Sequence, residues 1–191
     1  MDYPMRSDLK VGNKFPDFEL PDHTGTPQKL SQLLRGFPGV LIFSRGYYCP
    51  KDRRQMTNYV NDLQPEFRVN YCKMITVSVD DKYATNEVRT ALGADWPFLS
   101  DPDHKLLHEL EMVDTTDPIH GEVYIPYTFI LDRDRTIYKI YNGWWFLGRP
   151  TVEEIRMDLR AVMSKRKDWI YPGDGKGEPV TASNADVVKT N

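Results

Sequence analysis

Short apolar runs alternate with helical segments along most of this chain, and this alternation limits the fold more than any other feature. The runs at 40–44 and 74–79 are apolar and include β-branched residues, as buried strands do. Helical periodicity follows each run, first from Pro50 and then over 85–92. Strands that alternate with helices predict an α/β fold, with a partly parallel sheet covered on both faces.

The remaining segments extend this pattern. Pro65 is expected to end or kink the helix that starts at Pro50. From Pro172 onward, glycine and proline accumulate, so we predict one domain over 1–171 and a flexible tail over 172–191. Further elements are expected at 18–20 (strand), 30–34 (helical turn), 96–99 (strand), 104–110 (helix), 127–131 and 136–141 (hairpin strands) and 152–163 (helix).

Charge and hydropathy exclude several classes of partner. The 25 basic and 28 acidic residues give a net charge of −3, so no basic excess indicates a nucleic-acid partner. The apolar runs are too short to span a membrane. Residues 1–10 lack the apolar segment of a secretory signal, and we therefore expect a cytoplasmic protein.

Cys49 stands where a nucleophile is expected. It follows the strand at 40–44 and precedes Pro50, a residue favoured at the first position of a helix. Sites in α/β sheets lie beyond the carboxyl ends of strands. A helix N-terminus and nearby cations stabilise a thiolate, so the sequence predicts a lowered pKa for Cys49. The nearby cations are Arg45, Lys51, Arg53 and Arg54.

The second cysteine is separated from the first. Cys72 begins the strand at 74–79, and about seven residues at roughly 3.3 Å each place it on the order of 20 Å from Cys49. A disulfide needs Cα atoms within roughly 7 Å, so none is predicted. Cys72 is expected to be a buried apolar filler.

A metal site is not predicted either. His104 and His108 have the i, i+4 spacing of a helical ligand pair, but no third ligand is evident in the sequence. The sequence does not predict a bound cofactor.

Five segments together resemble the peroxiredoxins, the alkyl hydroperoxide reductase/thiol-specific antioxidant (AhpC/TSA) or redoxin group of the thioredoxin superfamily. The resemblance covers about residues 11–165. It implies a thioredoxin-like fold, with a mixed central sheet and helices on both faces, and a thiol-dependent peroxidase activity. The segments are 11–20 (VGNKFPDFEL), 77–80 (VSVD), 97–101 (PFLSD), 129–132 (FILD) and 148–151 (GRPT).

The resemblance also implies roles for individual residues. Cys49 falls where the family keeps its peroxidatic cysteine, which attacks hydrogen peroxide or an organic hydroperoxide. Asp52 stands where a glutamate orients an active-site arginine, and Arg149 falls where many members keep a second active-site arginine. With no local resolving cysteine, an external thiol of the thioredoxin or glutathione type would reduce the product. Whether the protein forms a homodimer stays open at this point.

Two positions depart from the family pattern. Gly46 replaces a threonine that contacts the peroxide, and Pro126 replaces the principal arginine. The segment 125–129 (IPYTF) instead resembles thioredoxins, whose cis-proline lies beside the reactive cysteine. The segment 45–50 (RGYYCP) resembles a subgroup with Arg-Gly before an aromatic-Cys-Pro motif, and we hypothesise that Arg45 supplies the missing guanidinium.

Two alternative functions stay open at this point. One is a thiol–disulfide oxidoreductase that uses Cys49, which Pro126 favours and Asp52 disfavours, because Asp52 occupies the second cysteine position of a Cys-x-x-Cys motif. The other is a non-enzymatic redox sensor with a thioredoxin-like fold.

Overall fold

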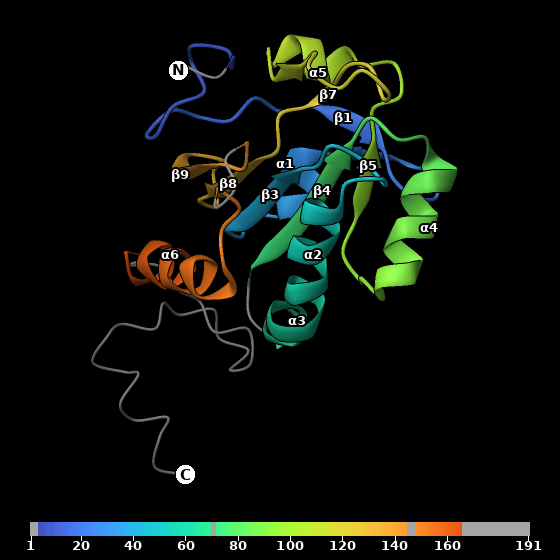
Figure 1. The fold of residues 1–191 in the computed structure, drawn as a ribbon. Coiled ribbons are helices and arrows are strands. Elements are labelled where there is room, and N and C mark those ends of the chain that lie inside the picture. Colours follow the sequence, from blue (N-terminus) through green and yellow to red (C-terminus); the bar gives the residue numbers. More distant parts are fainter. Residues whose placement is uncertain (1–3, 70–71, 145–147, 166–191) are drawn as a thin grey trace, which may run out of the picture.

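A five-stranded mixed sheet forms the centre of the described chain (Figure 1). The computed structural model describes residues 4–69, 72–144 and 148–165. Strands β3, β4 and β5 are parallel to one another, whereas β8 is antiparallel to both β3 and β9. In spatial order the strands are β5 (Phe98–Ser100), β4 (Lys73–Ser78), β3 (Gly39–Phe43), β8 (Tyr127–Leu131) and β9 (Ile137–Asn142). The predicted α/β class and the 127–141 hairpin are confirmed.

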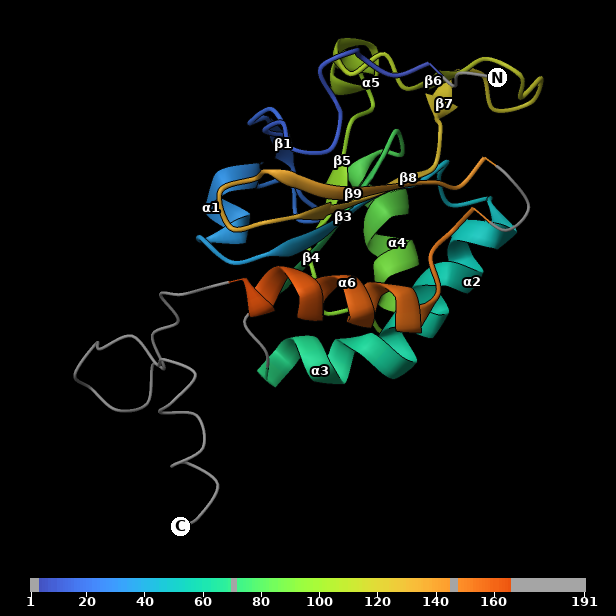
Figure 2. The same cartoon turned by 90° about the vertical axis from the view of Figure 1, so that its left-hand side faces the viewer.

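Three amphipathic helices and a π-helical turn cover one face of this sheet (Figure 2). They are α2 (Pro50–Asn58), α4 (Lys82–Leu92), α6 (Val152–Ser164) and η1 (Tyr59–Leu63). Their buried side chains pack against alternate strand residues such as Val40 and Ile42. The last helix, α6, begins with the capping box of Thr151 and Glu154 that its sequence indicates.

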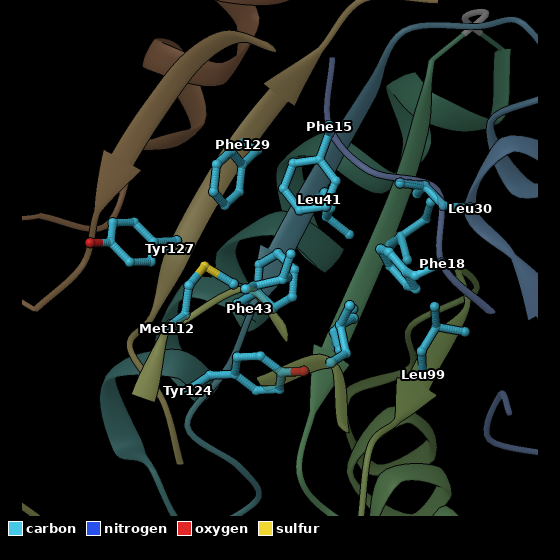
Figure 3. Packing of buried hydrophobic residues seen from close by; sticks show 14 of the residues in the cluster. Phe15, Phe18, Leu30, Leu41, Phe43, Leu99, Met112, Tyr124, Tyr127 and Phe129 are labelled. Carbon is cyan, nitrogen blue, oxygen red and sulfur yellow. The ribbon is translucent and has the colours of Figure 1, made fainter. Parts of the chain in front are cut away.

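The opposite face packs against α1 (Leu30–Leu34), α5 (Lys105–Glu109) and the N-terminal segment. Aromatic rings fill much of this core (Figure 3), where Phe15 lies 4.9 Å from Phe129 between ring centroids. Because both faces are covered, every residue of β3 and β8 is buried. This explains why β3 appears in the sequence as a continuous apolar run.

Two small hairpins were not predicted as such. Strand β1 (Glu19–Pro21) pairs with β2 (Pro27–Lys29), and β6 (Val113–Asp114) pairs with β7 (Val123–Tyr124). The strands are two or three residues long, which is too short for a period-two pattern to distinguish them from a loop.

Of the two expected effects of Pro65, an end to the first helix is wrong, whereas a break in its α-helical geometry occurs just before the proline. Helix α2 passes through η1 into α3 (Gln64–Val69), and Pro65 lies inside α3. A proline lacks the N–H for the helical hydrogen bond and its ring crowds the carbonyl four residues earlier. The wider π-turn immediately before it adjusts the hydrogen bonding and lets the helical segment continue.

The predicted tail over 172–191 lies outside the described residues. Among the helices of the described residues, none is long and apolar enough to cross a bilayer.

Candidate active site

The site is built on the junction between β3 and α2. Cys49 is the N-cap residue of α2 and Pro50 is the first residue of the helix, as predicted. The Cys49 carbonyl accepts a hydrogen bond from Arg53 N (3.0 Å), and Cys49 N donates to the Gly46 carbonyl (3.2 Å). These bonds hold the thiol at the carboxyl end of β3, where it is only 6% exposed.

Arg149 brings a guanidinium to the thiol from 100 residues further along the chain. Its Nη2 lies 3.7 Å from Cys49 Sγ, and its Nε donates to Asp52 Oδ1 at 2.6 Å. Nη2 also lies 2.5 Å from the same Asp52 oxygen. The structure therefore places Cys49, Asp52 and Arg149 in one cluster.

Asp52 is buried and joins two parts of the site. Its second oxygen, Oδ2, accepts from Arg45 N (2.8 Å) and Ser44 Oγ (3.2 Å) in the loop before Cys49. A charged guanidinium and a backbone N–H satisfy this carboxylate, so its burial is compensated. Asp52 consequently ties the β3–α2 loop to Arg149.

Pro126 acts on the site through backbone bonds. Its carbonyl accepts a hydrogen bond from Gly143 N (2.7 Å), and the Gly143 carbonyl accepts one from Arg149 Nη1 (2.8 Å). A Cβ on Gly143 would lie 2.5 Å from the Pro126 oxygen, so this close approach requires glycine. Pro126 thus helps to hold Arg149 in place.

The cis geometry that the resemblance to thioredoxins implied for Pro126 is wrong. No peptide bond of the described residues is cis. Tyr127 N donates to the Ile125 carbonyl (2.8 Å), which makes Pro126 the centre of a three-residue turn. The fixed φ of proline suits this turn with a trans bond.

Gly46 is required by its backbone conformation. Its φ of +122° is rarely adopted by other residues, and a Cβ there would lie 2.9 Å from Asp80 Oδ1. Tyr47 N donates to the other Asp80 oxygen (2.9 Å), which fixes the loop at this distance. The loop therefore has no room for the threonine that the family pattern would place here.

Arg45 also reaches the site, with its charge held by two carboxylates. Its Nη2 lies 3.1 Å from Asp114 Oδ2, a contact between charges without hydrogen-bond geometry, and 3.2 Å from Asp117 Oδ2. Arg149 lies 3.7 Å from Cys49 Sγ and is one of the groups that oppose the raised pKa of the thiol.

Three residues around Arg45 were missed by sequence reasoning. Tyr48 donates to Asp117 Oδ2 (2.8 Å), and its ring stacks on His120 with 3.3 Å between centroids. Burial, together with Asp117, raises the pKa of Tyr48 to about 12, although Arg45 opposes the shift. Asp117 and His120 lie in the 115–122 segment, about 70 residues from Tyr48 in the chain, and no local pattern indicates this contact.

A cavity of about 210 Å³ opens beside the thiol. Its walls combine cationic and aromatic side chains with the start of α2, a composition that suits a small polar molecule. The lining residues are Arg45, Tyr48, Cys49, Pro50, Lys51, Gly143, Trp144 and Arg149.

The predicted lowering of the Cys49 pKa is wrong. Burial raises the pKa of the thiol, and the Asp52 carboxylate raises it further. The backbone N–H groups of Asp52 and Lys51 and the Arg149 guanidinium oppose this effect without reversing it. Lys51, Arg53 and Arg54 follow Cys49 in the sequence, but these residues are exposed at the surface of α2.

This raised pKa predicts a steep pH dependence. A thiolate is the attacking form, so the second-order rate constant of the Cys49 reaction with peroxide should rise about tenfold per pH unit below its pKa. We expect the rise to continue through neutral pH to above roughly pH 8.5, the ordinary thiol value. Stopped-flow kinetics on the reduced protein measures this profile, and a constant rate from about pH 6 to pH 8 would contradict it.

Cys72 lies at the other end of the sheet. It directly precedes β4, whose first residue pairs with the first residue of β3, whereas Cys49 follows the last residues of β3. Neither cysteine forms a disulfide, as expected. Cys72 is 6% exposed and lines another cavity, of about 290 Å³, with Phe67, Met74 and Trp96 among its neighbours.

Comparison with known proteins finds one matching family profile and two similar sequences. The AhpC/TSA family profile matches residues 11–140. Two Mycobacterium tuberculosis proteins that carry a peroxiredoxin name, from strains CDC 1551 and H37Rv, are each 30% identical over 166 residues. The match spans 82% of this chain and 99% of each relative.

Solved structures show the same fold. A peroxidoxin of Mycobacterium tuberculosis superposes with a TM-score of 0.68 at 24% identity, over 83% of this chain and 99% of that one. A yeast mitochondrial 1-Cys peroxiredoxin, described with a thiol-resolving mechanism through glutathione and thioredoxin systems, has a TM-score of 0.67 at 18% identity. That match covers 87% of this chain and 82% of the yeast one. The thioredoxin-like fold is therefore confirmed.

Proposed function

Because the chain belongs to the AhpC/TSA family and is a peroxiredoxin-type thiol peroxidase, we propose that it works with one peroxidatic cysteine, Cys49, and an external thiol reductant. Its substrates would be hydrogen peroxide or small organic hydroperoxides. The observation that carries this proposal is the contact of Arg149 with both Cys49 Sγ and Asp52.

The proposed reaction begins with attack of the Cys49 thiolate on one peroxide oxygen. The S–O bond forms as the O–O bond breaks, which yields a cysteine sulfenic acid and a hydroxide or alkoxide that takes a proton from solvent. Arg149 would stabilise the thiolate before the attack and the negative charge on the leaving oxygen during it.

The residues around Cys49 and Arg149 have separate proposed roles. Asp52 would hold Arg149 in the orientation that reaches both the sulfur and the peroxide, and Pro126 would support Arg149 through Gly143.

Arg45 would contribute a further hydrogen-bond donor at the cavity wall. Gly46 and Pro50 would shape the loop and the helix start that present the thiol.

An external thiol would complete the cycle. It attacks the sulfenic sulfur and releases water, and a second thiol then reduces the mixed disulfide to regenerate the Cys49 thiol. The yeast relative, described with glutathione and thioredoxin systems, supports this choice of reductant. The position of Cys72 at the far end of the sheet supports a step that does not use it.

Mass spectrometry of the reduced protein tests this proposal. After one equivalent of hydrogen peroxide, we expect Cys49 to gain one oxygen and to react with a sulfenic-acid trap, while Cys72 stays a thiol. Cys72 serves as the internal control, since it is as deeply buried as Cys49. Oxidation at Cys72 first, or a Cys49–Cys72 disulfide, would contradict the single-cysteine cycle.

The same protein preparation distinguishes the proposed peroxidase from the alternative, a thiol–disulfide oxidoreductase. We expect catalytic turnover with hydrogen peroxide and a thiol, and little turnover when a mixed disulfide replaces the peroxide. Asp52 accounts for this preference, because it fills the position of the second thiol in a dithiol motif and is engaged with Arg149. Faster turnover with the disulfide would favour the oxidoreductase.

A further inference from the structure

Three side chains with metal-ligand chemistry meet away from Cys49. His104 is the N-cap residue of α5, His108 follows one turn later, and Glu122 directly precedes β7. The ligand atoms of the three residues all lie within 4.8 Å of one another. Glu122 supplies the third ligand that the sequence spacing of the two histidines did not reveal.

The distances within this group suit a shared ion. His108 Nε2 lies 3.1 Å from Glu122 Oε2, close to the separation of about 3.4 Å between two ligands on a tetrahedral zinc with bonds of about 2.05 Å. The His104 and His108 rings lie 6.3 Å apart between centroids, at 65°. Small side-chain rotations would bring the His104 nitrogen within reach of the same ion.

The two elements that carry these ligands are joined beneath them. Asp101 Oδ2 accepts hydrogen bonds from Tyr124 Oη in β7 (2.7 Å) and from Leu107 N in α5 (2.9 Å). His108 N also bonds to the His104 carbonyl (3.1 Å), which sets the two histidines one turn apart. The protein therefore positions the ligand backbone before any ion binds.

We propose that His104, His108 and Glu122 bind one divalent transition-metal ion of the Zn²⁺ type, with water filling the remaining positions. Two imidazoles and one carboxylate form a donor set that zinc accepts. Magnesium and calcium prefer oxygen ligands, so the two nitrogens select against them. The side chains of His108 and Glu122 are 54% and 44% exposed, which leaves a path for the ion.

The bound ion would also restrict the motion of the 115–122 segment, which contacts residues of the active site. Glu122 ends the 115–122 segment, and Asp117 in this segment holds Arg45 and Tyr48 beside Cys49. Ile119, at its outer edge, is 83% exposed. An ion that joins Glu122 to α5 therefore restricts the far end of the segment that positions Arg45.

Calorimetric titration with Zn²⁺ tests the site. The parent protein for this experiment carries Cys49→Ser, because a thiolate is itself a zinc ligand. We expect one Zn²⁺ per chain. His104→Ala, His108→Ala and Glu122→Gln should each weaken binding by about tenfold or more, the loss found even for residues that only orient zinc ligands.

Asp103→Asn is the matched control. Its carboxylate is 71% exposed one residue before His104 and pairs with Lys105, so it shares the location of the site without belonging to the trio. We expect unchanged Zn²⁺ affinity in this variant. Unchanged affinity in the three ligand variants, or equal weakening in Asp103→Asn, would overturn the proposal.

Limited proteolysis gives a readout that is independent of peroxidase activity. Zn²⁺ should slow proteinase K cleavage within 115–122 in the parent protein and leave it unchanged in Glu122→Gln. The same cleavage rate with and without bound Zn²⁺ would refute the link between the ion and this segment.

Discussion

Replacing Cys49 with serine should reduce catalysed peroxide consumption to the background rate of the reductant alone, a loss of at least about 10³-fold. A serine hydroxyl is scarcely ionised near neutral pH, and neither the α2 N-terminus nor Arg149 can make it a comparable nucleophile. A coupled assay that follows hydrogen peroxide and thiol consumption measures this loss.

Cys72→Ser is the matched control for this prediction. Cys72 is as deeply buried as Cys49 and lies at the other end of the sheet. We expect less than about a twofold change in the rate constant, together with a loss of about 1–3 kcal/mol in the free energy of unfolding, because a hydroxyl replaces a buried thiol. Equal loss of activity in both variants would refute the single-cysteine mechanism.

Arg149→Ala should lower the second-order rate constant with peroxide by about 10²–10³-fold. The substitution removes the cation that lies 3.7 Å from Cys49 Sγ, and with it the donor proposed for the leaving oxygen. It should also raise the pKa of Cys49 further, since Arg149 is one of the groups that oppose the effect of burial. The pH–rate profile should therefore shift to higher pH.

A double-mutant cycle tests whether Asp52 acts through Arg149. Asp52→Ala frees the guanidinium from its partner at Oδ1 and should reduce the rate constant by itself. If its role is to orient Arg149, the double variant Asp52→Ala/Arg149→Ala should be no slower than Arg149→Ala alone. Additive losses would show that Asp52 acts independently.

Arg53→Ala is the control for the charge change. Arg53 lies in the same turn of α2 as Asp52, but it is exposed. We expect less than about a twofold change in the rate constant, because solvent screens an exposed charge. A loss comparable to that of Arg149→Ala would mean that the rate depends on net charge near the helix and not on the Arg149 contact.

Sequence reasoning succeeded best for elements with a strong local pattern. The buried runs of β3 and β4 and the capping box of α6 each depend on residues close together in the chain. The short hairpins and the π-turn before Pro65 lack such a pattern, because a few residues carry too little periodicity.

The electrostatics of Cys49 show where the same reasoning failed. Cations close to Cys49 in the sequence suggested a lowered pKa, yet the Asp52 carboxylate raises it, and the Arg149 guanidinium that opposes the rise comes from far along the chain. Burial has the largest effect on this pKa, and it depends on packing around the thiol. Sequence distance is therefore a poor guide to the field at this sulfur.

The sequence alone determined the α/β class, the location of Cys49 at a strand–helix junction and the separation of Cys49 from Cys72, because strand length and helix starts follow from local residue order. Only the tertiary structure decided which charges face the thiol, that Pro126 is trans and that Glu122 joins His104 and His108. These features depend on contacts between segments far apart in the chain, and side-chain directions at such contacts are set by packing, which local sequence does not encode.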